Sequence, residues 1–196
     1  MKITIIVLAV AVLAGLLVAG CSSVRGGYET APYRVVRHDG KFELRDYSTL
    51  VLVETPMRGS DDSFMRLFRF IGGDNAAKQK ISMTTPVYMA GEKTNATMAF
   101  VMPKTMSANQ TPKPTDPGVT VREISGGEFA VYRFSGTRSA ASETNAVGKL
   151  TAWLAEKKLK SVGGTIFGYF DPPWTPSFLR RNEVMLRVDK VVEGSR

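Results

Sequence analysis

The chain has 196 residues, with 26 Lys and Arg against 18 Asp and Glu, which gives a formal net charge of +8. This length is sufficient for one domain with its own hydrophobic core. The Lys and Arg residues form no run of the nucleic-acid-binding type, so we do not expect a nucleic-acid partner. The excess of basic residues is consistent with contact with anionic lipid or with an anionic ligand. It is also consistent with a surface charge that only keeps the domain soluble.

The amino-terminal segment is an uncharged apolar run from Ile3 to Gly20 that follows Lys2. It predicts a signal peptide over residues 1–20. A retained membrane span is the alternative, because the run approaches the length of one. The run ends in Val18-Ala19-Gly20-Cys21, which resembles the bacterial lipobox, where small residues precede a cysteine that becomes the lipidated amino terminus. The sequence therefore predicts acylation of Cys21 and a membrane anchor made of several acyl chains.

Cys21 is the only cysteine in the chain. Its acylation would leave the exported domain without a thiol, which excludes disulfides, zinc–thiolate sites and cysteine nucleophiles. Ser22 follows, and in Gram-negative lipoproteins this resembles an outer-membrane sorting signal. We therefore expect attachment to the exported side of a bacterial membrane, with the periplasmic face of the outer membrane favoured in a Gram-negative host. The expected organisation is a lipidated tether over 21–27, a folded domain over 28–192 and a tail over 193–196.

The first half of the folded domain predicts two strands, a helix and two more strands. Phe42–Tyr47 alternates apolar and charged residues, which is typical of a half-buried strand. Gly72-Gly73 predicts the end of the helix. The helix is indicated by apolar residues at helical spacing, Phe64, Leu67, Phe68 and Ile71. The expected strands are residues 42–47, 50–55, 81–89 and 97–102.

The second half predicts the same order of elements, with no obvious similarity between the residues of the two halves. The expected strands are residues 119–124, 128–134, 165–170 and 183–188. The helix is expected over residues 142–158, and Gly163-Gly164 is interpreted as its cap. Strand–helix–strand–strand occurring twice predicts an α+β domain with a curved or barrel-like antiparallel sheet and both helices packed on it.

Three segments resemble the SOUL/haem-binding protein family. They are residues 80–87 (KISMTTPV), 168–176 (GYFDPPWTP) and 180–184 (RRNEV), and residues 33–36, 42–47 and 70–73 fit the same pattern. The resemblance covers about residues 28–192. It implies a distorted antiparallel β-barrel of two βαββ-like halves with two helices. It also implies binding of haem or another tetrapyrrole, that is, a flat apolar anion.

The resemblance implies an apolar groove beside the first helix, with basic residues for the propionates. The positions that match are Phe64, Phe68, Arg69 and Arg66 on the helix, facing Trp174 and Thr175. Aromatic faces suit a flat macrocycle, and an arginine can pair a carboxylate with a fork of donors. Core packing is the alternative role of the two phenylalanines. Thr175 occupies a position where some relatives carry a basic residue, which removes one propionate partner.

Axial ligation of haem iron has little support in the sequence. The only histidine, His38, is interpreted as an exposed residue beside a turn and is a weak metal candidate. Some relatives carry a proposed ligand in an Arg-His-Tyr context, and the matching residues here are Arg45-Asp46-Tyr47. A carboxylate is a poor substitute for imidazole on haem iron. We therefore expect no metal site and tetrapyrrole contact without a strong protein ligand.

An enzymatic role is not expected, because a single turn histidine offers no catalytic triad. Glu183 is expected to form an ion pair with Arg180 or Arg181. Two alternatives to tetrapyrrole binding stay open. One is a structural or interaction role at the cell envelope without haem. The other, weaker, is a small-molecule hydrolase, which would require a deep pocket that contains Glu43 or Glu183.

Overall fold

The computed structural model describes residues 27–58, 62–91 and 95–189. The predicted signal peptide, Cys21, almost all of the tether and the 193–196 tail lie outside these residues. Within the described part, no helix is both long enough and apolar enough to cross a membrane.

The described chain contains the helices α2 (Asp62–Gly72) and α3 (Ala140–Glu156) and a short 3-10 helix, η2 (Ser177–Leu179). The strands are β1 (Glu29–Thr30), β2 (Tyr33–Asp39), β3 (Phe42–Tyr47), β4 (Leu50–Pro56), β5 (Thr84–Thr85), β6 (Val87–Ala90), β7 (Thr97–Val101), β8 (Thr120–Ile124), β9 (Gly127–Phe134), β10 (Ser161–Tyr169) and β11 (Asn182–Val188).

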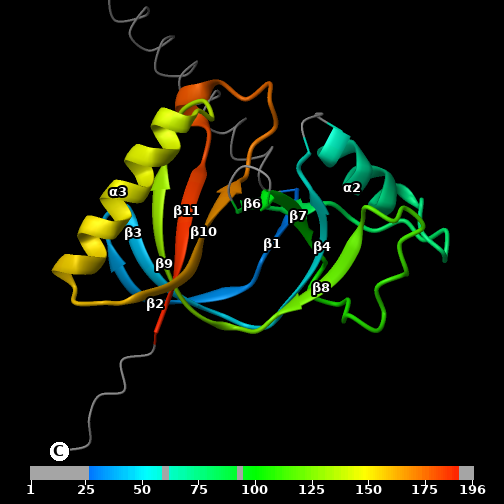
Figure 1. Ribbon diagram of the computed structural model, residues 1–196, viewed down its shortest axis with the longest axis horizontal. Coiled ribbons are helices and arrows are strands. Elements are labelled where there is room, and N and C mark those ends of the chain that lie inside the picture. The colour runs from blue at the N-terminus through cyan, green and yellow to red at the C-terminus, as the bar shows by residue number, and fades with distance from the viewer. Residues whose placement is uncertain (1–26, 59–61, 92–94, 190–196) are drawn as a thin grey trace, which may run out of the picture.

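Nine strands form one antiparallel sheet in the order β2-β3-β9-β11-β10-β6-β7-β4-β8. The units β4-α2-β6-β7 and β9-α3-β10-β11 each place their last strand between the other two. They meet where β10 pairs with β6, with Gly168 opposite Tyr88. The α+β fold of two strand–helix–strand–strand halves is thus confirmed. The sheet is strongly curved, but β2 and β8 end it without joining, so it is an open sheet rather than a closed barrel (Figure 1).

The two helices pack on the same face of the sheet, one on each half (Figure 1). Leu150 and Trp153 of α3 pack with Val184 of β11. Leu67 of α2 packs with Phe100 of β7. Successive side chains on a strand point to opposite faces of the sheet. The strand residues next in sequence to those that contact the helices therefore lie on the other face. There a third cluster contains Tyr47, Leu52, Tyr88, Ala99, Phe129, Val131 and Met185.

Two local predictions were wrong. The strand expected over 81–89 is interrupted at the cis Thr85–Pro86 bond, and its first part, β5, pairs with β1 in a small parallel sheet. Gly163-Gly164 is not a helix cap but lies inside β10, where the register against β11 shifts between Val162 and Ile166. Gly163 has a φ of +78°, a left-handed conformation that glycine adopts without steric cost at a bulge.

Candidate ligand-binding surfaces

The apolar stripe of α2 is divided between the core and the surface. Leu67 is fully buried and Ile71 is buried beside it, whereas Phe64 is 38% and Phe68 is 47% exposed. The two phenylalanine rings stack with centroids 6.0 Å apart and planes inclined by 16°. Phe64 also meets the ring of Phe100 edge-on. Phe64 and Phe68 thus form a partly exposed, stacked aromatic pair on the surface of α2.

The two arginines of α2 differ in their contacts. Arg66 is half-buried, donates to the Thr55 hydroxyl at 2.8 Å and pairs with Asp116 at 3.5 Å. Arg69 is exposed, and no described residue forms an ion pair with its guanidinium. At 100° per residue, Phe64, Phe68, Met65 and Arg69 fall on one 140° arc of the helix. We call these four residues the α2 patch.

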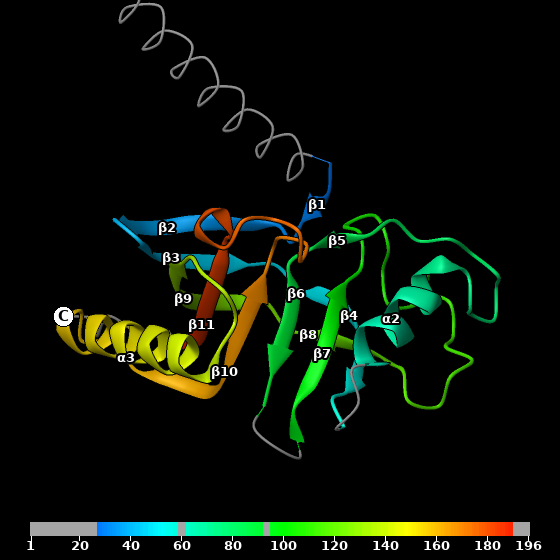
Figure 2. The ribbon, with the colours of Figure 1, turned by 90° about the horizontal axis from the view of Figure 1, so that it is seen from above.

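Trp174 and Thr175 belong to the loop of residues 170–181, between β10 and β11. Trp174 is 80% exposed, whereas Thr175 is buried. Figures 1 and 2 show this loop above the ends of β10 and β11, with α2 on the far side of β6 and β7. A small cleft beside Arg69, between α2 and residues 114–119, has a volume of about 30 Å³ and no lining residue from this loop. The helix residues and the loop residues therefore lie on separate parts of the surface.

The candidate metal ligand, His38, lies on β2, beside the turn at Gly40. Its side chain is largely exposed, with Nε2 3.9 Å from a Glu43 oxygen. Asp46, the position where some relatives have histidine, pairs with Arg34 at 3.1 Å. β2 and α2 lie at opposite ends of the sheet (Figure 1). Among the described residues, no three His, Cys, Asp or Glu side chains are grouped so that they could hold a metal ion.

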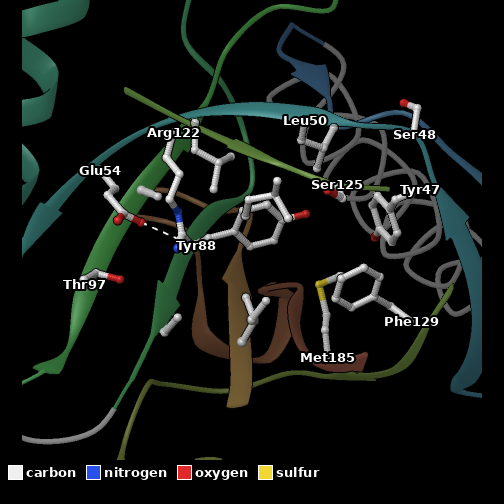
Figure 3. Close-up of a pocket in the computed structure, with 15 residues that line it drawn as sticks. Tyr47, Ser48, Leu50, Glu54, Tyr88, Thr97, Arg122, Ser125, Phe129 and Met185 are labelled. Atoms are coloured by element: carbon white, nitrogen blue, oxygen red, sulfur yellow. Dashed lines mark ion pairs between the residues drawn. The ribbon is translucent and has the colours of Figure 1, made fainter. Parts of the chain in front are cut away.

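A pocket on the concave face of the sheet was not predicted from the sequence. Figure 3 shows Tyr88 at its centre, with Phe129 and Met185 beside it and the Arg122–Glu54 ion pair, 3.5 Å long, at its edge. Its lining comes from strands of both halves, namely Tyr47, Ser48, Leu50, Leu52, Glu54, Tyr88, Ala90, Thr97, Ala99, Arg122, Ile124, Ser125, Phe129, Ile166 and Met185. These positions lie on eight different strands and two turns, so only the register of the whole sheet brings them together.

The concave pocket is too small for a macrocycle. Its free volume is about 50 Å³, whereas pockets for drug-sized ligands typically measure about 300–1,000 Å³. Burial raises the pKa of the Tyr47 hydroxyl to about 12, and burial also raises the pKa of Tyr88 well above its usual value. The inner wall of this pocket is therefore neutral over the physiological range of pH.

A buried ionic network lies on the same face. Arg45 donates to Glu183 through both terminal nitrogens, at 2.7 and 2.9 Å, and to Glu43 through Nε at 2.6 Å. Arg181 also pairs with Glu183, at 2.6 Å, which confirms one of its two predicted partners. Arg180 instead donates to the carbonyl oxygens of residues 173 and 175. Burial by itself opposes ionisation of Glu183, but the hydrogen bonds and charges of Arg45 and Arg181 hold its pKa below the usual value.

Comparison with known proteins identifies the family. The model for the SOUL heme-binding protein family matches residues 28–187. The chain belongs to the SOUL family. It is 27% identical over 180 residues to Heme-binding protein 1 of Xenopus tropicalis, a match that covers 83% of this chain and 94% of that protein. Membership in the SOUL family supports haem or tetrapyrrole binding as the general class of function.

Solved structures show the same fold at low sequence identity. The C-terminal domain of EcmrR has a TM-score of 0.58 at 12% identity, with 81% of this chain and 99% of that chain covered. A hydrolase from Listeria innocua has a TM-score of 0.59 at 12% identity, with 79% and 94% covered. At this identity the likeness concerns the fold alone. In this SOUL protein, neither Glu43 nor Glu183 lines the concave pocket, and Arg45 pairs with both.

The residues of the α2 patch suit contact with the macrocycle of a tetrapyrrole better than ligation of its iron. The α2 patch offers two partly exposed aromatic rings, a thioether chain and an exposed guanidinium, which suit an apolar macrocycle with carboxylates. Haem iron is typically held by His, Cys, Met or Tyr. The single histidine belongs to β2, which lies at the opposite end of the sheet from α2 (Figure 1). The iron would therefore have no imidazole from this chain at the α2 patch.

Proposed function

We propose that this SOUL protein is a lipid-anchored, exported protein that binds haem or a related tetrapyrrole on the α2 patch. The observation that carries the proposal is the exposed, stacked pair of Phe64 and Phe68 beside an uncommitted Arg69. A buried stripe would have made these rings part of the core. Their exposure leaves apolar ring surface open to a ligand, with the cation of Arg69 on the same side of the helix.

The physical chemistry of the patch predicts moderate affinity. Covering the exposed parts of the two rings would contribute about 25 cal/mol for each Å² removed from water. A solvent-exposed Arg69–propionate pair adds only about 0–1 kcal/mol. Without an iron–imidazole bond, these contributions have to offset the entropy lost on binding. We expect a dissociation constant on the order of micromolar, in keeping with a protein that holds and releases its ligand.

The proposed anchor determines where this binding takes place. Acylation of Cys21 would attach the domain to the exported face of the membrane, in a Gram-negative host the periplasmic face of the outer membrane. Residues 22–27 form a tether of about 20 Å at full extension. An apolar tetrapyrrole that partitions into lipid would then be within reach of the domain.

Titration with haemin and with metal-free protoporphyrin IX tests the proposal. The two ligands should bind within about threefold of each other, because the iron gains no strong protein ligand. Phe68→Ala should weaken both ligands by about three- to tenfold, a loss near 1 kcal/mol. Arg69→Ala should weaken both ligands by up to about fivefold, because an exposed ion pair contributes at most about 1 kcal/mol. Arg34→Ala, an exposed arginine on β2, and Phe178→Ala, an exposed aromatic on the 170–181 loop, are the matched controls.

Three results would contradict the proposal or part of it. Unchanged affinity in both α2 variants would remove the α2 patch from the binding site. Haemin bound more than about a hundredfold tighter than protoporphyrin IX would show that iron ligation dominates. If neither ligand binds and a partner protein is recovered from detergent-solubilised membranes, the envelope interaction role is favoured instead.

A further inference from the structure

The 170–181 loop displays the two most exposed large apolar side chains in the described chain. Trp174 is 80% exposed and Phe178 is 74% exposed, whereas each phenylalanine of the α2 patch is less than half exposed. Single surface apolar residues need no explanation. Two bulky aromatic side chains four positions apart on one loop are thus open to solvent.

The loop is held in a defined conformation by its own hydrogen bonds. Arg180 donates from Nε to the carbonyl oxygen of Thr175 at 2.8 Å, so its side chain braces the segment next to Trp174. The main-chain N–H of Arg181 donates to Asp171 at 2.6 Å and closes the base of the loop. Pro172, Pro173 and Pro176 restrict the backbone further. The backbone that carries the two aromatic side chains is therefore restrained, which lowers the entropy lost on binding.

The loop lies at the end of the sheet where the described chain begins. Tyr169, which precedes the loop, pairs with Val87 of β6. Two residues before Val87, Thr85 pairs with Thr30 of β1. Figure 2 shows β1 and this loop at neighbouring positions. Thr30 is nine residues after Cys21 in the sequence, so the proposed anchor and the aromatic loop would face the same membrane.

Near this end, the exposed basic residues Arg34 and Lys104 lie beside the carboxylates of Asp46 and Glu29. Arg34 of β2 is largely exposed, and its guanidinium pairs with Asp46 at 3.1 Å. Lys104 is exposed, and its main-chain N–H donates to Glu29 of β1 at 2.6 Å. Basic residues near a membrane are attracted to anionic headgroups, and Trp residues concentrate at the level of the headgroups.

We infer that the 170–181 loop inserts Trp174 and Phe178 into the interfacial region of the lipid bilayer. This inference rests on the proposed anchor but not on tetrapyrrole binding. It gives the anchored domain a second contact with the membrane, so that the domain is held in one orientation instead of swinging freely on its tether.

Tryptophan fluorescence of the mature lipoprotein in vesicles tests the inference. The chain has two tryptophans, and the other, Trp153, is buried with its indole N–H donating to Asp39. Trp153→Phe therefore reports on Trp174 alone, and Trp174→Phe reports on Trp153 alone. The vesicles contain phosphatidylcholine and phosphatidylglycerol, with or without brominated acyl chains that quench nearby indoles.

The expected result is selective quenching. Brominated lipid should lower the emission of the Trp153→Phe protein about twofold, as expected for an indole at headgroup level, and leave the Trp174→Phe protein unchanged. Acrylamide, a water-soluble quencher, should reach Trp174 less well in vesicles than in detergent. A second variant, Phe178→Ser, should move Trp174 emission towards that of a water-exposed indole.

The other outcomes overturn the inference in distinguishable ways. A protein that floats with the vesicles but keeps Trp174 open to acrylamide overturns insertion and leaves the anchor intact. A protein that does not float overturns the anchor and the insertion together. If Trp174→Ala weakens protoporphyrin IX binding tenfold and brominated lipid does not quench the Trp153→Phe protein, the loop belongs to the ligand site and not to the membrane contact.

Discussion

Arg45 and Glu183 form a doubly hydrogen-bonded ion pair across 138 residues of sequence, with N–O distances of 2.7 and 2.9 Å. Both side chains are 1% exposed. The pair connects β3 with β11 across β9, on the face of the sheet that carries the concave pocket. Arg45 has further partners in Glu43 and the Tyr47 hydroxyl. Its charge is thus fully compensated in a place that water does not reach.

Glu183→Gln should destabilise the fold by about 3–5 kcal/mol, because it leaves a buried guanidinium with an incomplete set of charged partners. Urea denaturation monitored by circular dichroism measures this loss. The control is Asp46→Asn, which breaks the exposed pair with Arg34 and should cost only about 0–1 kcal/mol. A loss below 1 kcal/mol for Glu183→Gln would contradict the structural importance of the network.

Stability should fall in acid because of the same carboxylate. The Glu183 pKa lies below its ordinary value of 4.5, since the pairing with Arg45 and Arg181 outweighs the effect of burial. A carboxyl whose folded-state pKa is depressed contributes stability above its unfolded-state pKa and loses that contribution as the pH falls through the folded-state pKa. The free energy of unfolding should therefore decrease as the pH is lowered from about 5.

Urea denaturation at a series of pH values checks this acid dependence. The Glu183→Gln protein should show a shallower decline than the wild type over the same range, because glutamine does not titrate. Parallel curves for the two proteins would assign the acid dependence to other carboxylates.

Adjacent residues of α2 should respond very differently to truncation. Leu67→Ala should cost about 2–5 kcal/mol, since its side chain is fully buried among β4 and β7 residues. Phe68→Ala should cost about 1 kcal/mol or less, since almost half of the side chain is exposed. Thermal and urea unfolding of both variants measures the difference. Equal losses would show that Phe68 belongs to the core, and its effect on ligand binding would then need another explanation.

Cys21 is expected to determine the attachment of the protein to the membrane. Cys21→Ser should abolish acylation and processing after residue 20, so that the intact mass retains residues 1–20 and lacks the lipid. Mass spectrometry and membrane fractionation of the expressed protein measure this. In a Gram-negative host, Ser22→Asp should move the lipoprotein from the outer to the inner membrane. An unmodified Cys21 in the wild-type protein would favour a retained membrane span.

Local patterns predicted much of the fold because the period of a helix or strand can be recognised from residues that are close in sequence. The alternation over 42–47 matches β3, and the helical spacing around Phe64 to Ile71 matches α2. Periodicity failed at Gly163-Gly164, since a glycine pair after a helix and one inside a bulged strand look alike. It also failed over residues 81–89, which the structure divides into the separate strands β5 and β6.

The sequence by itself determined the order of the elements, the two repeated halves, the single cysteine and the SOUL-family resemblance. Only the tertiary structure decided which side of each element faces the core. Leu67 and Phe68 lie on one apolar stripe, yet contact with Val53 and Phe100 buries the first and leaves the second at the surface. The concave pocket and the Arg45–Glu183 pair likewise depend on strands distant in sequence. The physical reason is that periodicity is a local property, whereas burial is set by what the register of the whole sheet places opposite each residue.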